Sequence, residues 1–246
     1  SSDLTRAHKA AKRYIYAWGG GRAEGNGSLK DLLGGKGAGL AEMTLAGLPT
    51  PPGFTITTEA CNEYMRLAEQ LPGGLMDEVA AAREALEAKM GKRLGDADDP
   101  LLVSVRSGAP VSMPGMMETV LDIGLCDATV NGLLRHRGNP RLVWDAYRGL
   151  VCGFGEVVMG IDPAVFEADQ LAVLGDPARH ADDFVELRAL TRAHLASVQR
   201  VSGQPFPQDP QTQLARAIGA VFDSWQAPKA QRWRQLKGLD GAMGTA

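Results

Sequence analysis

Hydrophobic side chains recur every three or four positions over residues 75–90, with charged residues on the other faces, which predicts an amphipathic helix. Gly91 follows directly and marks its end. Three shorter segments have strand-like patterns: residues 14–16, the alternating residues 54–57 and the apolar run 101–105. Because that run carries apolar residues on both faces, it predicts a buried strand.

From about Asp127 to Arg200 nearly the whole pattern is helical. Helices are predicted to begin at Asn139-Pro140 and at Asp162-Pro163, since a capping side chain before proline is a helix start signal. A third is predicted over 184–198. The prolines between 202 and 210 indicate a linker, after which further helices begin at Asp209-Pro210 and at Pro228.

This order of elements predicts an α+β fold in three parts. Residues 1–125 form the α/β part, residues 126–203 form a mostly helical insert, and residues 204–246 form helices that return to the first part. At 246 residues, the chain is long enough for one large domain or two ordinary ones.

Composition excludes several classes of protein. The chain is 44% hydrophobic and 22% charged, which is typical of a globular protein and not of a disordered one. Its 26 Lys and Arg residues against 29 Asp and Glu residues give a net charge of −3, so no general basic field attracts nucleic acid. Any phosphate must therefore be bound by a local cluster of charge.

The cysteines and the apolar runs bear on the compartment. Cys61, Cys126 and Cys152 form no C-x-x-C pair, which disfavours a disulfide framework and a thiolate zinc site. No secretion signal and no apolar run of membrane-spanning length is present, so we expect a cytoplasmic protein with no membrane partner.

A glycine-rich run surrounds Lys36 at residues 34–39, where a loop is expected. Glycines let backbone N–H groups approach phosphate oxygens, and a lysine ammonium adds a point charge, so the run is suited to phosphate. The spacing is neither that of a P-loop nor that of a dinucleotide-binding fingerprint. The residues alone leave two interpretations open: a phosphate cradle, or a flexible loop before a helix with an exposed lysine.

A second candidate begins where the run 101–105 ends. Arg106 follows it directly, and the loop 107–117 carries no charge before Glu118. A guanidinium at a strand end can donate to two phosphate oxygens, and such a loop could close over a ligand. Alternatively, Arg106 pairs with a structural carboxylate and the methionines of the loop pack in the core.

Other familiar chemistry finds no support. The four histidines are expected to have surface or packing roles, and H-E-x-x-H and G-x-S-x-G are absent. The acidic residues Asp96, Asp98 and Asp99 lack the glycine and glutamate spacing of an EF-hand and are expected to cap an exposed turn.

These two loops, in this order, resemble the amino-terminal nucleotide-binding region of the pyruvate phosphate dikinase family. The similarity extends over nearly the whole chain from about Tyr14, which makes it far more specific than one glycine pattern. The densest matches are Leu-Leu-Gly-Gly-Lys-Gly at 32–37, Pro-Gly-Phe-Thr at 52–55, Leu-Leu-Val-Ser-Val-Arg-Ser-Gly at 101–108 and Met-Pro-Gly-Met-Met at 113–117, with weaker similarity as far as 244–246.

The resemblance implies specific roles for the candidate residues. Lys36 and Arg106 would bind ATP phosphates, with Arg106 as a catalytic residue, and Gly115, Met116 and Met117 would belong to the loop that covers the nucleotide. It also implies an ATP-grasp-like fold that is incomplete, because the family continues beyond the position of Ala246. Mg²⁺ ligands, the phosphohistidine and the pyruvate-binding barrel are expected in that further part.

The chain alone is therefore expected to be inactive, whether it is a fragment or a truncated relative. Pyruvate and phosphate would be partners only through the further domains, and the full-length enzyme could be a homodimer. Two alternatives stay open: a portion of an enzyme similar to phosphoenolpyruvate synthase, and a noncatalytic module that binds nucleotide or a partner chain.

Overall fold

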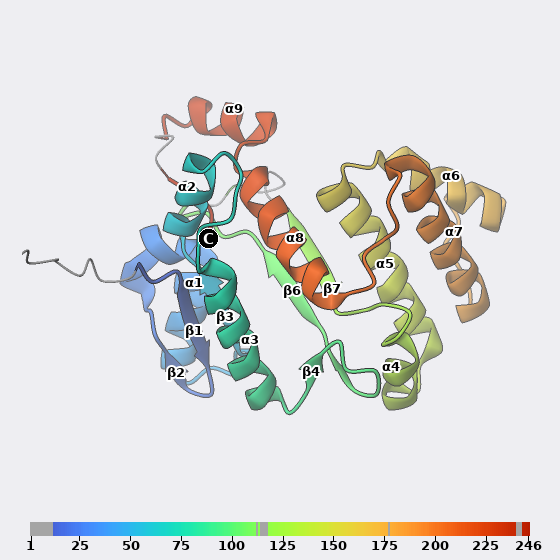
Figure 1. Ribbon diagram of the computed structural model, residues 1–246, viewed down its shortest axis with the longest axis horizontal. Helices are drawn as coiled ribbons and strands as arrows, with labels where there is room; N and C mark the ends of the chain where they lie inside the picture. The colour runs from blue at the N-terminus through green and yellow to red at the C-terminus, as the bar shows by residue number, and fades with distance from the viewer. Residues whose placement is uncertain (1–11, 112, 114–117, 177, 240–242) are drawn as a thin grey trace, which may run out of the picture.

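The computed structural model describes residues 12–111, 113, 118–176, 178–239 and 243–246. They form three parts that lie side by side: an amino-terminal part, a central part and a helical part (Figure 1). Helices and small sheets are both present, so the α+β class is confirmed. None of the helices in these ranges combines the length and apolar character that crossing a membrane requires.

The amino-terminal part is a small antiparallel sheet covered by helices. Strand β1 lies in the middle and pairs with β2 and β3, so that Ile15 faces Ile56 and Ala17 faces Phe54. The predicted helix over 75–90 is confirmed, and it ends at Gly91 in the left-handed conformation. The elements are β1 Ile15–Gly19, β2 Arg22–Ala23, the 3-10 turn η1 Gly27–Leu29, α1 Lys30–Leu45, β3 Gly53–Ile56, α2 Thr58–Arg66 and α3 Leu75–Met90.

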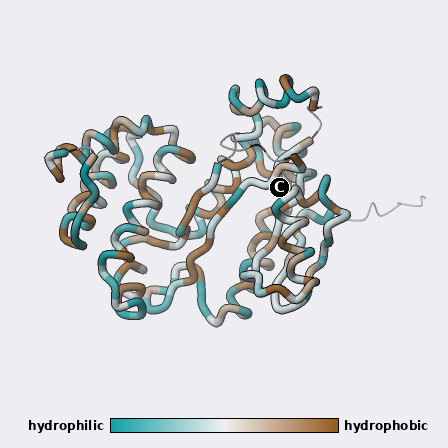
Figure 2. Tube along the Cα trace, turned by 180° about the vertical axis from the view of Figure 1, so that it is seen from behind, coloured by the Kyte–Doolittle hydropathy of each residue, from teal (hydrophilic) through white to brown (hydrophobic). Residues whose placement is uncertain are grey.

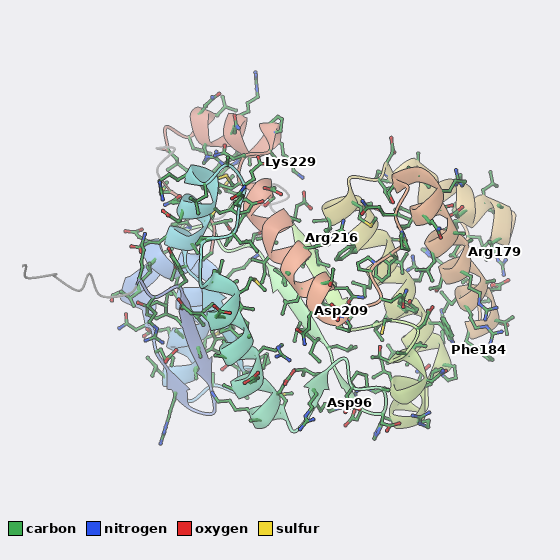
Figure 3. All side chains as sticks on the ribbon, in the orientation of Figure 1. Asp96, Arg179, Phe184, Asp209, Arg216 and Lys229 are labelled. Atoms are coloured by element: carbon green, nitrogen blue, oxygen red, sulfur yellow. The ribbon has the colours of Figure 1, made fainter. Side chains whose placement is uncertain are left out.

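The central part consists of two strand pairs and one helix. Strand β4 pairs in parallel with β5, β6 pairs antiparallel with β7, and α8 packs against both β6 and β7. Aromatic and charged side chains join α8 to the helical part: the Arg216 guanidinium lies 5.5 Å from the centre of the Phe154 ring (Figure 3). The elements are β4 Arg93–Leu94, β5 Pro100–Leu101, β6 Val103–Arg106, β7 Thr119–Ile123 and α8 Pro210–Ser224.

The prediction of one buried strand over 101–105 is wrong. The run divides at Leu102 into β5 and β6, and β6 is not buried: Val103 and Val105 are half-buried, whereas Ser104 is exposed. Val103 and Val105 pack partly against the core and also border a cavity. A continuous apolar run does not distinguish these two environments.

The helical part contains α4–α7, and α5 packs against α7 and against β7 of the central part. Its predicted helix starts are confirmed, because Asn139 and Asp162 accept hydrogen bonds from first-turn backbone N–H groups. Hydrophobic and hydrophilic positions are interspersed along these helices (Figure 2). The elements of this part are α4 Val130–Arg137, α5 Pro140–Met159, α6 Pro163–Leu174 and α7 Phe184–Ser202. The last helix of the chain, α9 Pro228–Leu236, follows α8 and lies outside the helical part (Figure 1).

A buried glutamine ties α8 to the end of β7. The Gln213 side chain is fully buried; its Oε1 accepts from the Gly124 N–H at 3.0 Å, and its Nε2 donates to the Leu125 and Pro207 carbonyls at 3.0 and 2.8 Å. Three backbone groups are thereby satisfied, two of them in buried hydrogen bonds and the Pro207 carbonyl in a partly buried one. The segment returning from the helical part is thus held to the strand that leads into it.

His194 fills a buried position between α6 and α7. Its Nδ1 lies 3.0 Å from Asp169 Oδ2, and its ring packs edge-on against Phe166. Burial lowers the pKa of His194 below its ordinary value, although Asp169 acts in the opposite direction. The expectation of a packing role for this histidine fits this position.

This burial predicts a pH-dependent stability. The unfolded chain takes up a proton on His194 near pH 6.5, whereas the folded chain resists protonation. Unfolding is therefore favoured as pH falls below about 6.5, by at most about 1.4 kcal/mol per pH unit. Urea unfolding between pH 7.5 and 5 should show this loss, and His194→Asn should reduce the slope. The exposed His180→Asn variant should keep the slope; an unchanged slope in His194→Asn would contradict the assignment.

Candidate functional site

The glycine-rich run does not form the predicted loop. Residues 30–45 are helical except at Gly34, where φ is +66° and ψ is 170° and the helix breaks. From Gly35 the helix resumes, so Lys36 lies in its first turn. Burial of Ala38 and Ala41 and the close packing of Gly37 against Thr55 of β3 outweigh the low helix propensity of glycine.

Gly34 brings α1 into contact with the backbone that follows β6. A Cβ atom added at Gly34 would lie 1.6 Å from the Gly108 carbonyl oxygen, so no side chain fits there. Beside this contact, the Gly35 N–H donates to the Ala109 carbonyl at 2.9 Å. The two segments singled out in the sequence therefore meet directly, backbone against backbone.

Lys36 reaches across this junction. Its Nζ donates to the Ser107 carbonyl oxygen at 2.8 Å, which holds the ammonium beside the end of β6. Partial desolvation and, second, the nearby Arg106 guanidinium lower the pKa of Lys36 from its ordinary value. The two cations thus lie within electrostatic reach of one another.

Lys36 and Arg106 border the same cavity, which has a volume of about 520 Å³. Among the described residues, no carboxylate forms an ion pair with either side chain. Two unneutralised cations side by side favour binding of an anion with several oxygens. The structure brings these two predicted residues together; their role in nucleotide binding stays a prediction.

The rest of the cavity is largely apolar. Its walls come from α1, β3, α3, β6 and α8, and its apolar side chains include Leu40, Phe54, Leu86, Met90 and Leu214. The cavity therefore joins a cationic end to a hydrophobic groove. This combination suits a ligand that carries both negative charge and an apolar, planar group.

Three predicted residues, Gly115, Met116 and Met117, lie outside the described residues. At the two ends of that loop, the Met113 side chain is buried in the core, and Glu118 forms an ion pair with Lys229 at the start of α9 (Figure 3). Of the described residues that flank this segment, Met113 thus lies in the core and Glu118 lies beside α9.

A second cavity, of about 430 Å³, lies between α5, α6 and α7 but has a different electrostatic character. Arg148 pairs with Asp145 at 2.7 Å, and Arg179 pairs with Asp182 and Glu186 at 2.8 and 2.7 Å. Two of the three arginines that line this cavity are thus neutralised within the helical part, whereas Arg141 forms no ion pair among the described residues.

The site also contains residues that the sequence did not single out. The Ser107 carbonyl holds Lys36, and Ala246 lines the cavity next to Gly108. A backbone acceptor leaves no signature in the side-chain sequence. The family similarity at 244–246 is a signal in the sequence that could have indicated Ala246.

The described residues contain no group of three or more His, Cys, Asp or Glu side chains placed to hold a metal ion. The acidic residues over 96–99 have another role, since Asp96 accepts the N–H groups of Asp98 and Asp99 and closes an exposed turn, as the sequence predicted. These carboxylates also pair with Lys92 and Arg135, so they do not fit a Mg²⁺ cage.

Two free cations at a glycine-lined junction, opening into an apolar groove, are typical of a protein that binds a phosphorylated small molecule. Comparison with known families agrees and is more specific. The family model described as "Pyruvate phosphate dikinase, AMP/ATP-binding domain" matches residues 30–70 and 67–246. The chain belongs to this family.

Pyruvate, phosphate dikinases from bacteria and plants are similar to this chain over nearly its whole length. The pyruvate, phosphate dikinase of Rhizobium meliloti (strain 1021) is 47% identical over 242 residues, which is 95% of this chain and 26% of the relative. The chloroplastic enzyme of Mesembryanthemum crystallinum is 46% identical over 252 residues, covering all of this chain and 26% of the relative. The pyruvate, phosphate dikinase of Clostridium symbiosum is 44% identical over 229 residues, which is 91% of this chain and 26% of the relative. The chain thus spans about a quarter of the length of these relatives.

Proposed function

We propose that this chain is the ATP-binding portion of a pyruvate phosphate dikinase, in which Lys36 and Arg106 bind the ATP phosphates. The observation that carries the proposal is the meeting of these two cations at one cavity, with no carboxylate among the described residues to neutralise them. The whole enzyme would use ATP to pyrophosphorylate a histidine outside this chain, which releases AMP. Inorganic phosphate would then accept the outer phosphoryl group and leave as pyrophosphate, and the remaining phosphoryl group would pass to pyruvate to form phosphoenolpyruvate.

The two cations would contribute differently to this reaction. The Lys36 ammonium is a point charge fixed by Ser107, whereas the Arg106 guanidinium can donate to two phosphate oxygens at once. Transfer between phosphates depends mainly on orientation and on stabilising negative charge, which both groups supply. The apolar groove would receive the adenine base and exclude water from that end of the nucleotide.

The same proposal covers the architecture. The amino-terminal and central parts would form the first portion of an ATP-grasp-like site, with residues 126–203 as a helical insert and 204–246 as the return. The packing of α8 on β6 and β7 supports this division. Gly115, Met116 and Met117 would cover the phosphates, and any Mg²⁺ would be bound by the further part of the enzyme.

Isothermal titration calorimetry with ATP tests the binding role. A charge-assisted hydrogen bond contributes about 1.5–3 kcal/mol, so Lys36→Met should raise the Kd for ATP by about 10- to 150-fold. Lys237→Met, which removes an exposed lysine beyond α9, is the matched control and should leave the Kd unchanged. A folded wild-type chain that gives no signal with ATP would support the noncatalytic alternative instead.

A further inference from the structure

The last described segment of the chain, residues 243–246, returns to the place where Gly34 of α1 meets Gly108 after β6 (Figure 1). The Gly108 N–H donates to the Ala246 carbonyl at 2.8 Å, and the Ala246 N–H donates to the Gly108 carbonyl at 3.1 Å. The Gly108 N–H also donates to Thr245 Oγ1 at 3.2 Å. Gly108 is therefore held from one side by residues 137 and 138 positions further along the chain.

Thr245 is itself firmly seated. Its side chain is completely buried, and its backbone hydrogen bonds to the Cys61 sulfur of α2. Next to it, Gly244 packs so closely on α2 that an added Cβ would lie 2.5 Å from the Thr58 carbonyl oxygen. Helix α2 thus contacts Gly244 and Thr245, and Thr245 in turn contacts Gly108.

From Gly108 the contacts lead to both cations. The preceding carbonyl, that of Ser107, is the acceptor for Lys36 Nζ, and Arg106 is one residue before it. On its other side Gly108 meets Gly34, just before Lys36 in α1. Any displacement of Gly108 therefore moves the acceptor of Lys36 and the end of the strand that carries Arg106.

We infer that Thr245 is a positioning residue, whose hydroxyl fixes Gly108 and thereby holds Lys36 and Arg106 in the relative positions that phosphate binding requires. This inference rests on the proposed function for its consequence in ATP binding. Its structural part concerns the chain without nucleotide and can be tested separately.

The test compares Thr245→Val, which keeps the shape and removes the hydroxyl, with Thr245→Ser, which keeps the hydroxyl. In the nucleotide-free chain, NMR titration of the Lys36 side chain should give a pKa below the ordinary lysine value, owing to desolvation and Arg106. In Thr245→Val this pKa should rise toward the ordinary value, and the Kd for ATP should increase about 2- to 10-fold, as expected for loss of one neutral hydrogen bond. Thr245→Ser should restore both.

A matched control separates positioning from general stability. Thr191 is equally buried, and its Oγ1 donates to the Leu187 carbonyl within α7. Thr191→Val therefore removes a comparable hydroxyl from the helical part of the molecule. It should lower the unfolding midpoint without changing the Lys36 pKa. The inference is overturned if Thr245→Val leaves both the pKa and the Kd unchanged, or if Thr191→Val changes them equally.

Two further outcomes are decisive. If Thr245→Val does not fold, Thr245→Ser carries the test: a folded serine variant with an ordinary Lys36 pKa overturns the inference, and one with the lowered pKa supports it. If the wild-type chain does not bind ATP but its Lys36 pKa shifts in Thr245→Val, the nucleotide proposal fails and the positioning of Lys36 by Thr245 stands.

Discussion

Replacing Gly34 with alanine is expected to abolish ATP binding and to destabilise the chain by about 3 kcal/mol or more. The added Cβ would overlap the Gly108 carbonyl oxygen at 1.6 Å, and a φ of +66° is unfavourable for alanine. The only relief is separation of α1 from the end of β6, which would pull Lys36 away from Ser107. Urea unfolding and calorimetry with ATP measure the two losses.

A chemically identical substitution five positions away is the control. Gly39 lies in the same helix, and a Cβ added there meets nothing within 4 Å. Gly39→Ala should therefore be neutral or stabilising by about 0.5–1 kcal/mol, with an unchanged Kd for ATP. Equal stability and equal ATP affinity in the two alanine variants would show that the Gly34 contact does not organise the site.

The contrast between these glycines shows what could not be predicted from the sequence. Both stand in one run that was expected to be a loop, yet the run is helical except at Gly34. Which glycine breaks the helix depends on Gly108, more than 70 residues away, and on the packing of Gly37 against Thr55. Local composition contains neither contact.

Features set by local chemistry were predicted well. The helix starts at Asn139 and Asp162 depend on a capping side chain and the proline after it, all within a few residues. The strand over 101–105 was wrong because burial of β6 depends on which elements flank it. Likewise, Lys36 and Arg106 could be named as separate candidates, but their common cavity follows from the pairing of distant backbone segments.

Removing both cations is expected to weaken ATP binding more than removing either one alone. Each charge-assisted contact contributes about 1.5–3 kcal/mol, so the double variant Lys36→Met/Arg106→Met should bind ATP about 150- to 25,000-fold more weakly than wild type in calorimetry. Arg106→Lys should fall between wild type and Arg106→Met, because an ammonium keeps the charge but loses the paired donors of a guanidinium.

Stability distinguishes this effect from misfolding. Partial desolvation and, second, repulsion by Arg106 lower the pKa of Lys36 in the nucleotide-free chain, and no carboxylate among the described residues pairs with either cation. The double variant should therefore unfold at the same or a higher urea concentration than wild type. With two fewer charges at the site, its residual ATP binding should also depend less on salt. If the double variant binds ATP within threefold of wild type, the phosphates do not lie between these two cations.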